Sequence, residues 1–168
     1  MADREPFGIA TFITPEAVGQ PGQRRFRIKA MNEDGRTVSL WLEKEQLSAL
    51  GDAIETVLKG EGYDLGPTRP AEEPVFPWKC DIDFRIGQLS LGLHRNERMI
   101  VLSAAEITEE QTAPTNSVAV AIDYGQSTAL SDDIVKVVAA GRAPCALCGG
   151  PLDPAGHVCP RQNGHSKG

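Results

Sequence analysis

The chain has 168 residues, of which 40 % are hydrophobic and 5 % aromatic, and its formal net charge is −6. This length fits one modest domain, alone or with a short appendix, and excludes two full-sized domains. The low aromatic content argues against a surface that stacks nucleic-acid bases, and no apolar run approaches the roughly 20 residues of a membrane-spanning helix. Because the first residues lack the basic and apolar regions of a signal peptide, we expect a cytoplasmic protein.

The first third of the chain predicts three strands and a helix. Residues 25–30 and 38–43 alternate between apolar and polar side chains, the period of a half-buried strand. Residues 7–13 form a further predicted strand, which we expect Pro15 to end. A helix should follow, because apolar residues then recur at helical spacing at Leu47, Leu50, Ile54, Val57 and Leu58.

The turn between the second and third strands can be specified further. A loop of three residues, 33–35, places Ile28 opposite Leu40 and keeps the apolar side chains on one face, whereas a two-residue loop mixes the faces. Gly35 then occupies the left-handed position that such a loop requires.

The sequence repeats itself at an offset of 80 residues. Val38 to Leu58 superposes on Val118 to Val138 without a gap, and seven of the 21 pairs are identical. Chance similarity between two amphipathic units is the alternative, but both polar and apolar positions match, so we favour a duplication. The second copy then supplies strands at 82–93, 99–102 and from Val118, with a bulge near Gly87 and a helix ending near Gly141.

These elements predict an α+β fold. Two βββα halves would form a long, mainly antiparallel sheet with two helices on one face, followed by a small C-terminal zinc knuckle. The expected divisions are a first half at 1–60, a Pro-rich linker at 61–79, a second half at 80–141 and a zinc-binding tail at 142–168.

Four residues near the C-terminus have the spacing of zinc ligands: Cys145, Cys148, His157 and Cys159. A Cys-x-x-Cys turn directs two thiolates at one ion, and the Pro/Gly-rich segment between the pairs cannot build a core of its own. We favour structural zinc over a redox pair or free thiols, because a redox Cys-x-x-Cys usually lies between a strand and a helix. His165 could replace His157 as the fourth ligand.

A basic stripe precedes the first hairpin and runs into it, formed by Arg24, Arg25, Arg27 and Lys29. The hairpin register places Arg27 opposite Trp41 and Arg25 opposite Glu43, which predicts cation–π and charge pairing within the sheet. Residues 1–140 carry 14 basic and 22 acidic residues, a net charge of −8, while residues 141–168 carry +2. Since phosphate backbones repel an acidic body, we interpret the stripe as structural, with local nucleic-acid binding as the alternative.

The remaining candidates for chemistry are few. Cys80 is expected to be a partly buried thiol rather than a nucleophile, because no histidine is near it in sequence. Asp132 and Asp133 would point about 100° apart on a helix, and we interpret them as favourable charges early in a helical turn. Glu43 and Asp123 lie at matching strand ends and could face a cleft between the halves.

Three segments resemble a bacterial family catalogued as domain of unknown function 3090: residues 143–164, 19–23 and 38–46. The resemblance spans most of the chain. It implies a cytoplasmic bacterial protein with a C-terminal Cys/His zinc knuckle, in which Cys145, Cys148, His157 and Cys159 match the pattern. It implies no activity and no substrate.

We therefore expect a cytoplasmic zinc-binding protein whose tail docks onto another protein. Two alternatives remain: an enzyme with its cleft between the two halves, and an accessory protein that binds nucleic acid. The closed set of four ligands favours a structural over a catalytic metal, since a catalytic zinc keeps one position open.

Overall fold

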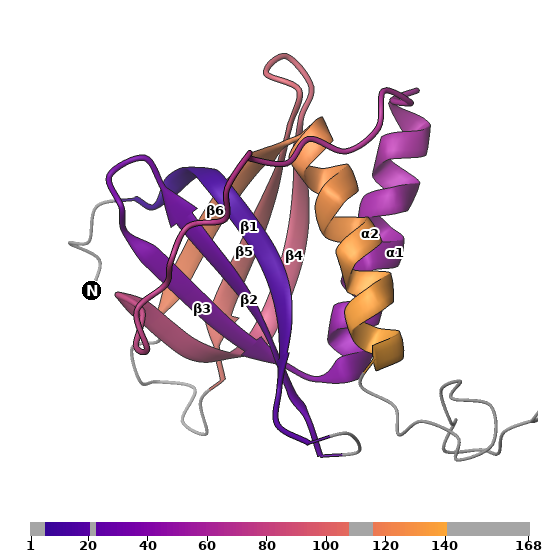
Figure 1. Ribbon diagram of the computed structural model, residues 1–168. Helices are drawn as coiled ribbons and strands as arrows, with labels where there is room; N and C mark the ends of the chain where they lie inside the picture. The colour runs from indigo at the N-terminus through magenta and orange to yellow at the C-terminus, as the bar shows by residue number, and fades with distance from the viewer. Residues whose placement is uncertain (1–5, 21–22, 108–115, 141–168) are drawn as a thin grey trace, which may run out of the picture.

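The computed structural model describes residues 6–20, 23–107 and 116–140, which form six strands and two helices (Figure 1). The elements follow one another in the order βββαβββα. They are β1 Gly8–Val18, β2 Arg25–Asn32, β3 Thr37–Leu42, α1 Lys44–Gly60, β4 Ile82–His94, β5 Met99–Glu106, β6 Ser117–Asp123 and α2 Tyr124–Ala140. None of the helices in the described part of the chain has the length and apolar character needed to cross a membrane.

The fold is α+β with a mainly antiparallel six-stranded sheet, as predicted, but the sheet is not open. The strands close into a barrel in the order β1-β2-β3-β4-β5-β6. Closure comes from a parallel contact of β1 with β6, Gly8 facing Val120 and Ile9 facing Ala121. A second parallel pair joins β3 to β4, because the crossover through α1 returns the chain in the same direction. The barrel thereby pairs the edge strands that an open sheet would expose.

The first hairpin has the predicted register. Ile28 faces Leu40, and Gly35 adopts a φ of +82° in a loop of three residues. The side chain of Asn32 closes this loop by accepting hydrogen bonds from the backbone N–H groups of Asp34 and Arg36, at 3.1 and 2.9 Å. The predicted bulge is also present, since the β4–β5 register shifts between Ile86 and Gln88, on either side of Gly87.

The first strand extends further than predicted. β1 continues through Pro15, which faces Ile28 of β2, and ends at Val18. β1 pairs with β6 only at Gly8 and Ile9, so beyond these residues the described strands flank it on the β2 side alone. A proline, which lacks an N–H group, is tolerated where a strand has a free edge.

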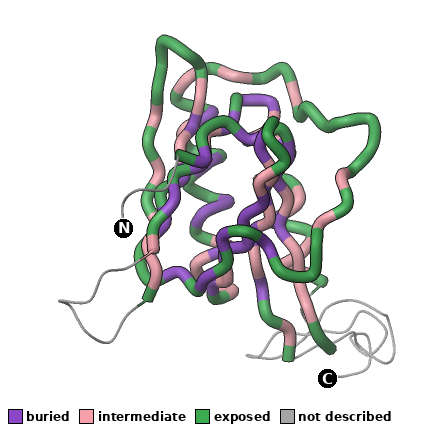
Figure 2. Tube along the Cα trace, turned by 90° about the vertical axis from the view of Figure 1, so that its left-hand side faces the viewer, coloured by how far each residue is buried: buried purple, intermediate pink, exposed green. Residues whose placement is uncertain are grey.

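Both helices lie side by side on one side of the barrel (Figure 1). Their buried faces join the barrel interior in one core, and buried segments lie inside the molecule while the outer loops are exposed (Figure 2). The largest side chains with under 2 % exposure come from both layers and include Ile28, Leu40, Leu102 and Ile122 of the barrel with Leu47, Ile54 and Leu130 of the helices. Burial of these aliphatic faces is the main source of stability.

The two helices are in close contact at Gly51. A Cβ atom placed there would lie 3.0 Å from Cγ2 of Ile134, and Ser131 Oγ donates a hydrogen bond of 3.2 Å to the Gly51 carbonyl. Glycine therefore permits a short distance between α1 and α2, and a larger side chain at this position would push the helices apart.

Candidate functional site

One cavity among the described residues has a volume of about 340 Å³ and lies where three segments meet. These are β1, the first turns of α2, and the segment between α1 and β4, residues 61–81, which we call the connector. The walls are formed by Thr11, Phe12, Ile13, Thr14, Thr68, Arg69, Pro70, Ala71, Glu73, Asp123, Gln126, Ala129 and Asp133.

The connector forms no helix or strand, as the sequence predicts, yet it is fastened to the fold at several points. The Thr68 N–H donates a hydrogen bond of 2.9 Å to the Gly125 carbonyl of α2. Further along, Phe76 packs on Phe12 of β1 with ring centroids 6.1 Å apart. These contacts hold the connector across the outside of the barrel, where Figure 1 shows it passing from the end of α1 to the start of β4.

A close contact of the connector with α2 depends on Gly125. A Cβ atom at this position would lie 2.0 Å from Thr68 Oγ1 and 2.8 Å from Thr68 Cβ. Real Cβ atoms do not approach other heavy atoms so closely, so only glycine allows the connector to lie against the first turn of α2. The contact between Thr68 and Gly125 thus holds this part of the cavity wall in place.

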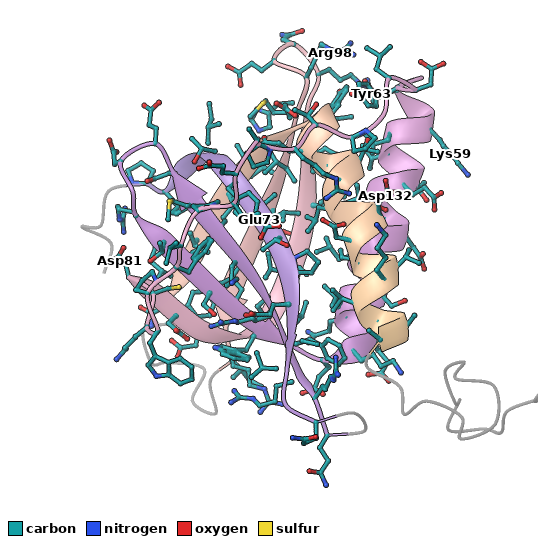
Figure 3. All side chains as sticks on the ribbon, in the orientation of Figure 1. Lys59, Tyr63, Glu73, Asp81, Arg98 and Asp132 are labelled. Atoms are coloured by element: carbon teal, nitrogen blue, oxygen red, sulfur yellow. The ribbon has the colours of Figure 1, made fainter. Side chains whose placement is uncertain are left out.

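Several lining residues of the cavity are charged. Arg69 of the connector donates to Asp133 of α2 at 2.7 Å, and this hydrogen bond raises the pKa of Arg69, so the pair stays ionised. Asp123 Oδ1 accepts a 2.7 Å hydrogen bond from the Gln126 N–H at the start of α2. Glu73 is exposed where the connector crosses in front of the barrel (Figure 3), and no described residue forms a hydrogen bond or ion pair with it.

A family model described as protein of unknown function, DUF3090, matches residues 6–159. The chain belongs to this family. The DUF3090 match covers the barrel, both helices and the connector, together with the segment that contains Cys145, Cys148, His157 and Cys159. It confirms the resemblance found in the sequence. No curated protein matches the chain.

The predicted zinc ligands of this DUF3090 protein, Cys145, Cys148, His157 and Cys159, lie outside the described residues, as does His165. Within residues 6–20, 23–107 and 116–140, no group of three or more His, Cys, Asp and Glu side chains could hold a metal. The described part of the structure therefore does not test the zinc prediction, which still rests on the sequence.

Glu43 and Asp123, the two carboxylates that the enzyme alternative would place at one cleft, are separated. Asp123 lies on the cavity wall, whereas Glu43 forms an ion pair of 2.7 Å with Arg85. The two helices run in opposite directions (Figure 1), so the carboxylates at their first turns lie at opposite ends of the helix pair. The cavity combines Asp123 with the connector instead.

Arg25, Arg27 and Lys29 of the basic stripe make contacts within the fold, and one predicted contact is wrong. Arg27 faces Trp41 as predicted, and the guanidinium groups of Arg25 and Arg27 lie 4.2 and 4.9 Å from the Trp41 ring centroid. The predicted pairing of Arg25 with Glu43 does not form, because Glu43 pairs with Arg85 and Arg25 stacks on Trp41. Arg27 also bonds Glu16 at 2.6 Å, so part of the positive charge is neutralised locally.

Asp132 and Asp133 lie later in their helix than expected. α2 begins at Tyr124, so both carboxylates occupy the middle of the helix and not its first turn. Asp123 is the residue at the start of α2 that accepts the N–H of Gln126. Asp133 contributes to the cavity wall through its ion pair with Arg69, while Asp132 is exposed.

Cys80 is buried, with 4 % of its surface exposed, and its burial raises the pKa of the thiol. The thiolate is the reactive form, and a raised pKa keeps the thiol protonated at neutral pH. We expect iodoacetamide at pH 8 to modify Cys80 at least several-fold more slowly in the folded protein than in urea. Mass spectrometry of the peptide that contains Cys80 measures both rates, and equal rates would contradict the buried, protonated thiol.

Proposed function

We propose that the protein is a ligand-binding protein and that the cavity between β1, the connector and α2 is its binding site. The observation that carries this proposal is the cavity of about 340 Å³, within the size range of small-molecule sites. Its lining combines the apolar residues Phe12 and Ala129 with polar residues of the connector and α2. Sites of this composition bury the apolar part of a ligand and orient its polar part.

A fragment screen monitored by NMR tests this proposal. We expect binding fragments to shift the backbone resonances of Thr11, Gln126 and Ala129, which line the cavity. The indole signal of Trp41, whose Nε1 donates to Asp83 at 2.9 Å and which is not on the cavity wall, serves as the internal control. Shifts confined to the Trp41 face would contradict the assignment. Chemical conversion of a bound fragment would point to the enzymatic alternative.

We further propose that residues 142–168 bind one zinc ion through Cys145, Cys148, His157 and Cys159. The support is the ligand spacing in the sequence, together with a family match that extends to residue 159. Because thiolate ligands persist in reducing compartments, the cytoplasm suits such a site. The role we propose for this tail is docking onto another protein. Nucleic acid is the less favourable partner because residues 1–140 carry a net charge of −8.

Cys148→Ala is expected to remove the zinc, because three remaining ligands hold the ion far more weakly than four. Elemental analysis of the purified protein should fall from about one zinc per chain to near zero. Cys80→Ala is the matched control, since Cys80 is buried in the body and should leave the zinc content unchanged. Full metal retention in Cys148→Ala would contradict the ligand set.

The same variant tests docking. We expect the full chain to capture a protein partner that Cys148→Ala captures weakly or not at all, and equal partner sets would contradict a docking role. His157→Ala and His165→Ala, compared by elemental analysis, distinguish the two candidate histidines. Loss of zinc in His165→Ala alone would replace His157 by His165 in the ligand set.

We also propose that the two βββα units, residues 1–60 and 80–141, arose by internal duplication. Three features support this. The Gln46 and Gln126 side chains both accept an N–H from the residue three positions earlier, each at 2.9 Å. Gly51 and Ser131, which are in contact, are separated by the offset of 80. The two parallel strand pairs join equivalent strands of the two units, the third of one to the first of the other.

A further inference from the structure

The cavity carries more negative than positive charge. Its lining includes three carboxylates, Glu73, Asp123 and Asp133, and one guanidinium, Arg69, which gives a net formal charge of −2. Arg69 forms an ion pair with Asp133 at 2.7 Å and also interacts electrostatically with Glu73, so Glu73 and Asp123 are the two lining carboxylates that form no ion pair within the described residues. These two groups come from different segments, the connector and the last residue of β6 directly before α2, and both belong to the lining of one cavity.

Both excess carboxylates have capacity for a ligand. Glu73 has no hydrogen bond or ion pair with any residue in the described ranges. Asp123 Oδ1 accepts the Gln126 N–H, and Oδ2 has no partner among the described residues. An ionised carboxylate accepts several hydrogen bonds, so an ammonium group with three donors could be shared between the two.

The lining also includes apolar residues. Phe12 and Ala129 are buried, and Pro70 and Ala71 lie on the connector. An apolar body of modest size would lose water-exposed surface by packing against these residues. The lining thus combines apolar residues with two exposed carboxylates, Glu73 and Asp123.

We propose that this cavity binds a small organic cation, a primary ammonium carried on an apolar body. This inference rests on the proposed ligand-binding function and specifies the chemical class of the ligand. The ammonium lies between Glu73 and Asp123, and the apolar body lies against Phe12 and Ala129. An anionic ligand is disfavoured, because the one guanidinium of the lining is already paired with Asp133 and the remaining carboxylates repel a negative charge.

Three probes of nearly equal shape distinguish the contribution of charge to the affinity from that of shape. They are cyclohexylmethylamine, cyclohexylmethanol and cyclohexanecarboxylate. Isothermal titration calorimetry of the full chain at low ionic strength should give the amine the highest affinity, by about 2- to 5-fold per carboxylate contacted. If the alcohol or the carboxylate binds as tightly as the amine, the cation assignment is overturned while the ligand-binding function stands. If no probe binds, both are overturned.

Two variants test the position of the charge. Glu73→Gln and Asp123→Asn should each weaken amine binding about 2- to 5-fold and leave alcohol binding unchanged. Asparagine still caps a helix, so Asp123→Asn should preserve α2, and an unchanged melting temperature checks this. Glu72→Gln is the matched control, because Glu72 is the exposed neighbour of Glu73 and is not on the cavity wall. Equal weakening by Glu72→Gln and Glu73→Gln would overturn the proposed contact.

Discussion

Ile134→Ala is expected to lower the free energy of unfolding by about 2–5 kcal/mol. Ile134 has 2 % of its surface exposed and packs in the contact between α2 and α1. Removing its outer carbons leaves a cavity in a close-packed core, and the surrounding side chains refill such a space only partly. Urea denaturation followed by circular dichroism measures the loss.

A second substitution should recover part of this stability. The three atoms nearest to a Cβ built on Gly51 all belong to Ile134, the closest at 3.0 Å. Gly51→Ala alone gains helix propensity of about 1 kcal/mol but crowds Ile134, so these effects oppose each other. In Ile134→Ala the crowding disappears and the added methyl fills vacated space. The double variant should therefore be more stable than Ile134→Ala by about 1 kcal/mol or more.

Ile54→Ala provides the matched control. Ile54 is the residue equivalent to Ile134 at the 80-residue offset and is fully buried in α1. Its truncation should cost a similar amount, but Gly51→Ala should not rescue it, because the contact with Ile134 remains. An equal effect of Gly51→Ala in the wild-type, Ile54→Ala and Ile134→Ala backgrounds would show that the two helices are not coupled at this glycine.

Local parts of the fold could be predicted because neighbouring residues determine them. The apolar alternation fixed the register of Ile28 with Leu40, and the phase slip near Gly87 predicted the bulge. Barrel closure could not be predicted in this way. It depends on a parallel contact of only two residue pairs, Gly8 with Val120 and Ile9 with Ala121, more than 100 positions apart in the sequence. No local pattern distinguishes such a contact from the free edge of an open sheet.

The sequence did not predict the cavity, for a related reason. Its walls come from three segments, and the sequence of the connector predicted an extended linker without indicating where it would lie. One signal was present in the repeat itself. At the offset of 80, Gly125 replaces Glu45 and Asp133 replaces Ala53, and both departures occur where α2 contacts the connector. Differences between two copies can thus mark a site that only one copy carries.

Gly125→Ala is expected to detach the connector from α2. The new methyl would lie 2.0 Å from Thr68 Oγ1 in the present arrangement, so the connector must withdraw and break the Thr68 N–H bond to the Gly125 carbonyl. Overpacking of this kind costs about 1–3 kcal/mol. Because alanine favours a helix more than glycine does, α2 itself should not be weakened. The effect should therefore be confined to the connector and the cavity that it covers.

Hydrogen exchange of peptides from residues 64–74 measures the detachment. A cost of about 1 kcal/mol or more raises local opening, and hence exchange, by about 5-fold or more, while peptides from β2 and β3 should not change. Amine binding should weaken in parallel, since Glu73 moves with the connector. Thr68→Gly removes both atoms that the methyl meets and keeps the N–H donor, so the double variant should restore slow exchange and amine affinity. Fast exchange in the double variant, or slow exchange in Gly125→Ala alone, would contradict the role assigned to this contact in building the cavity.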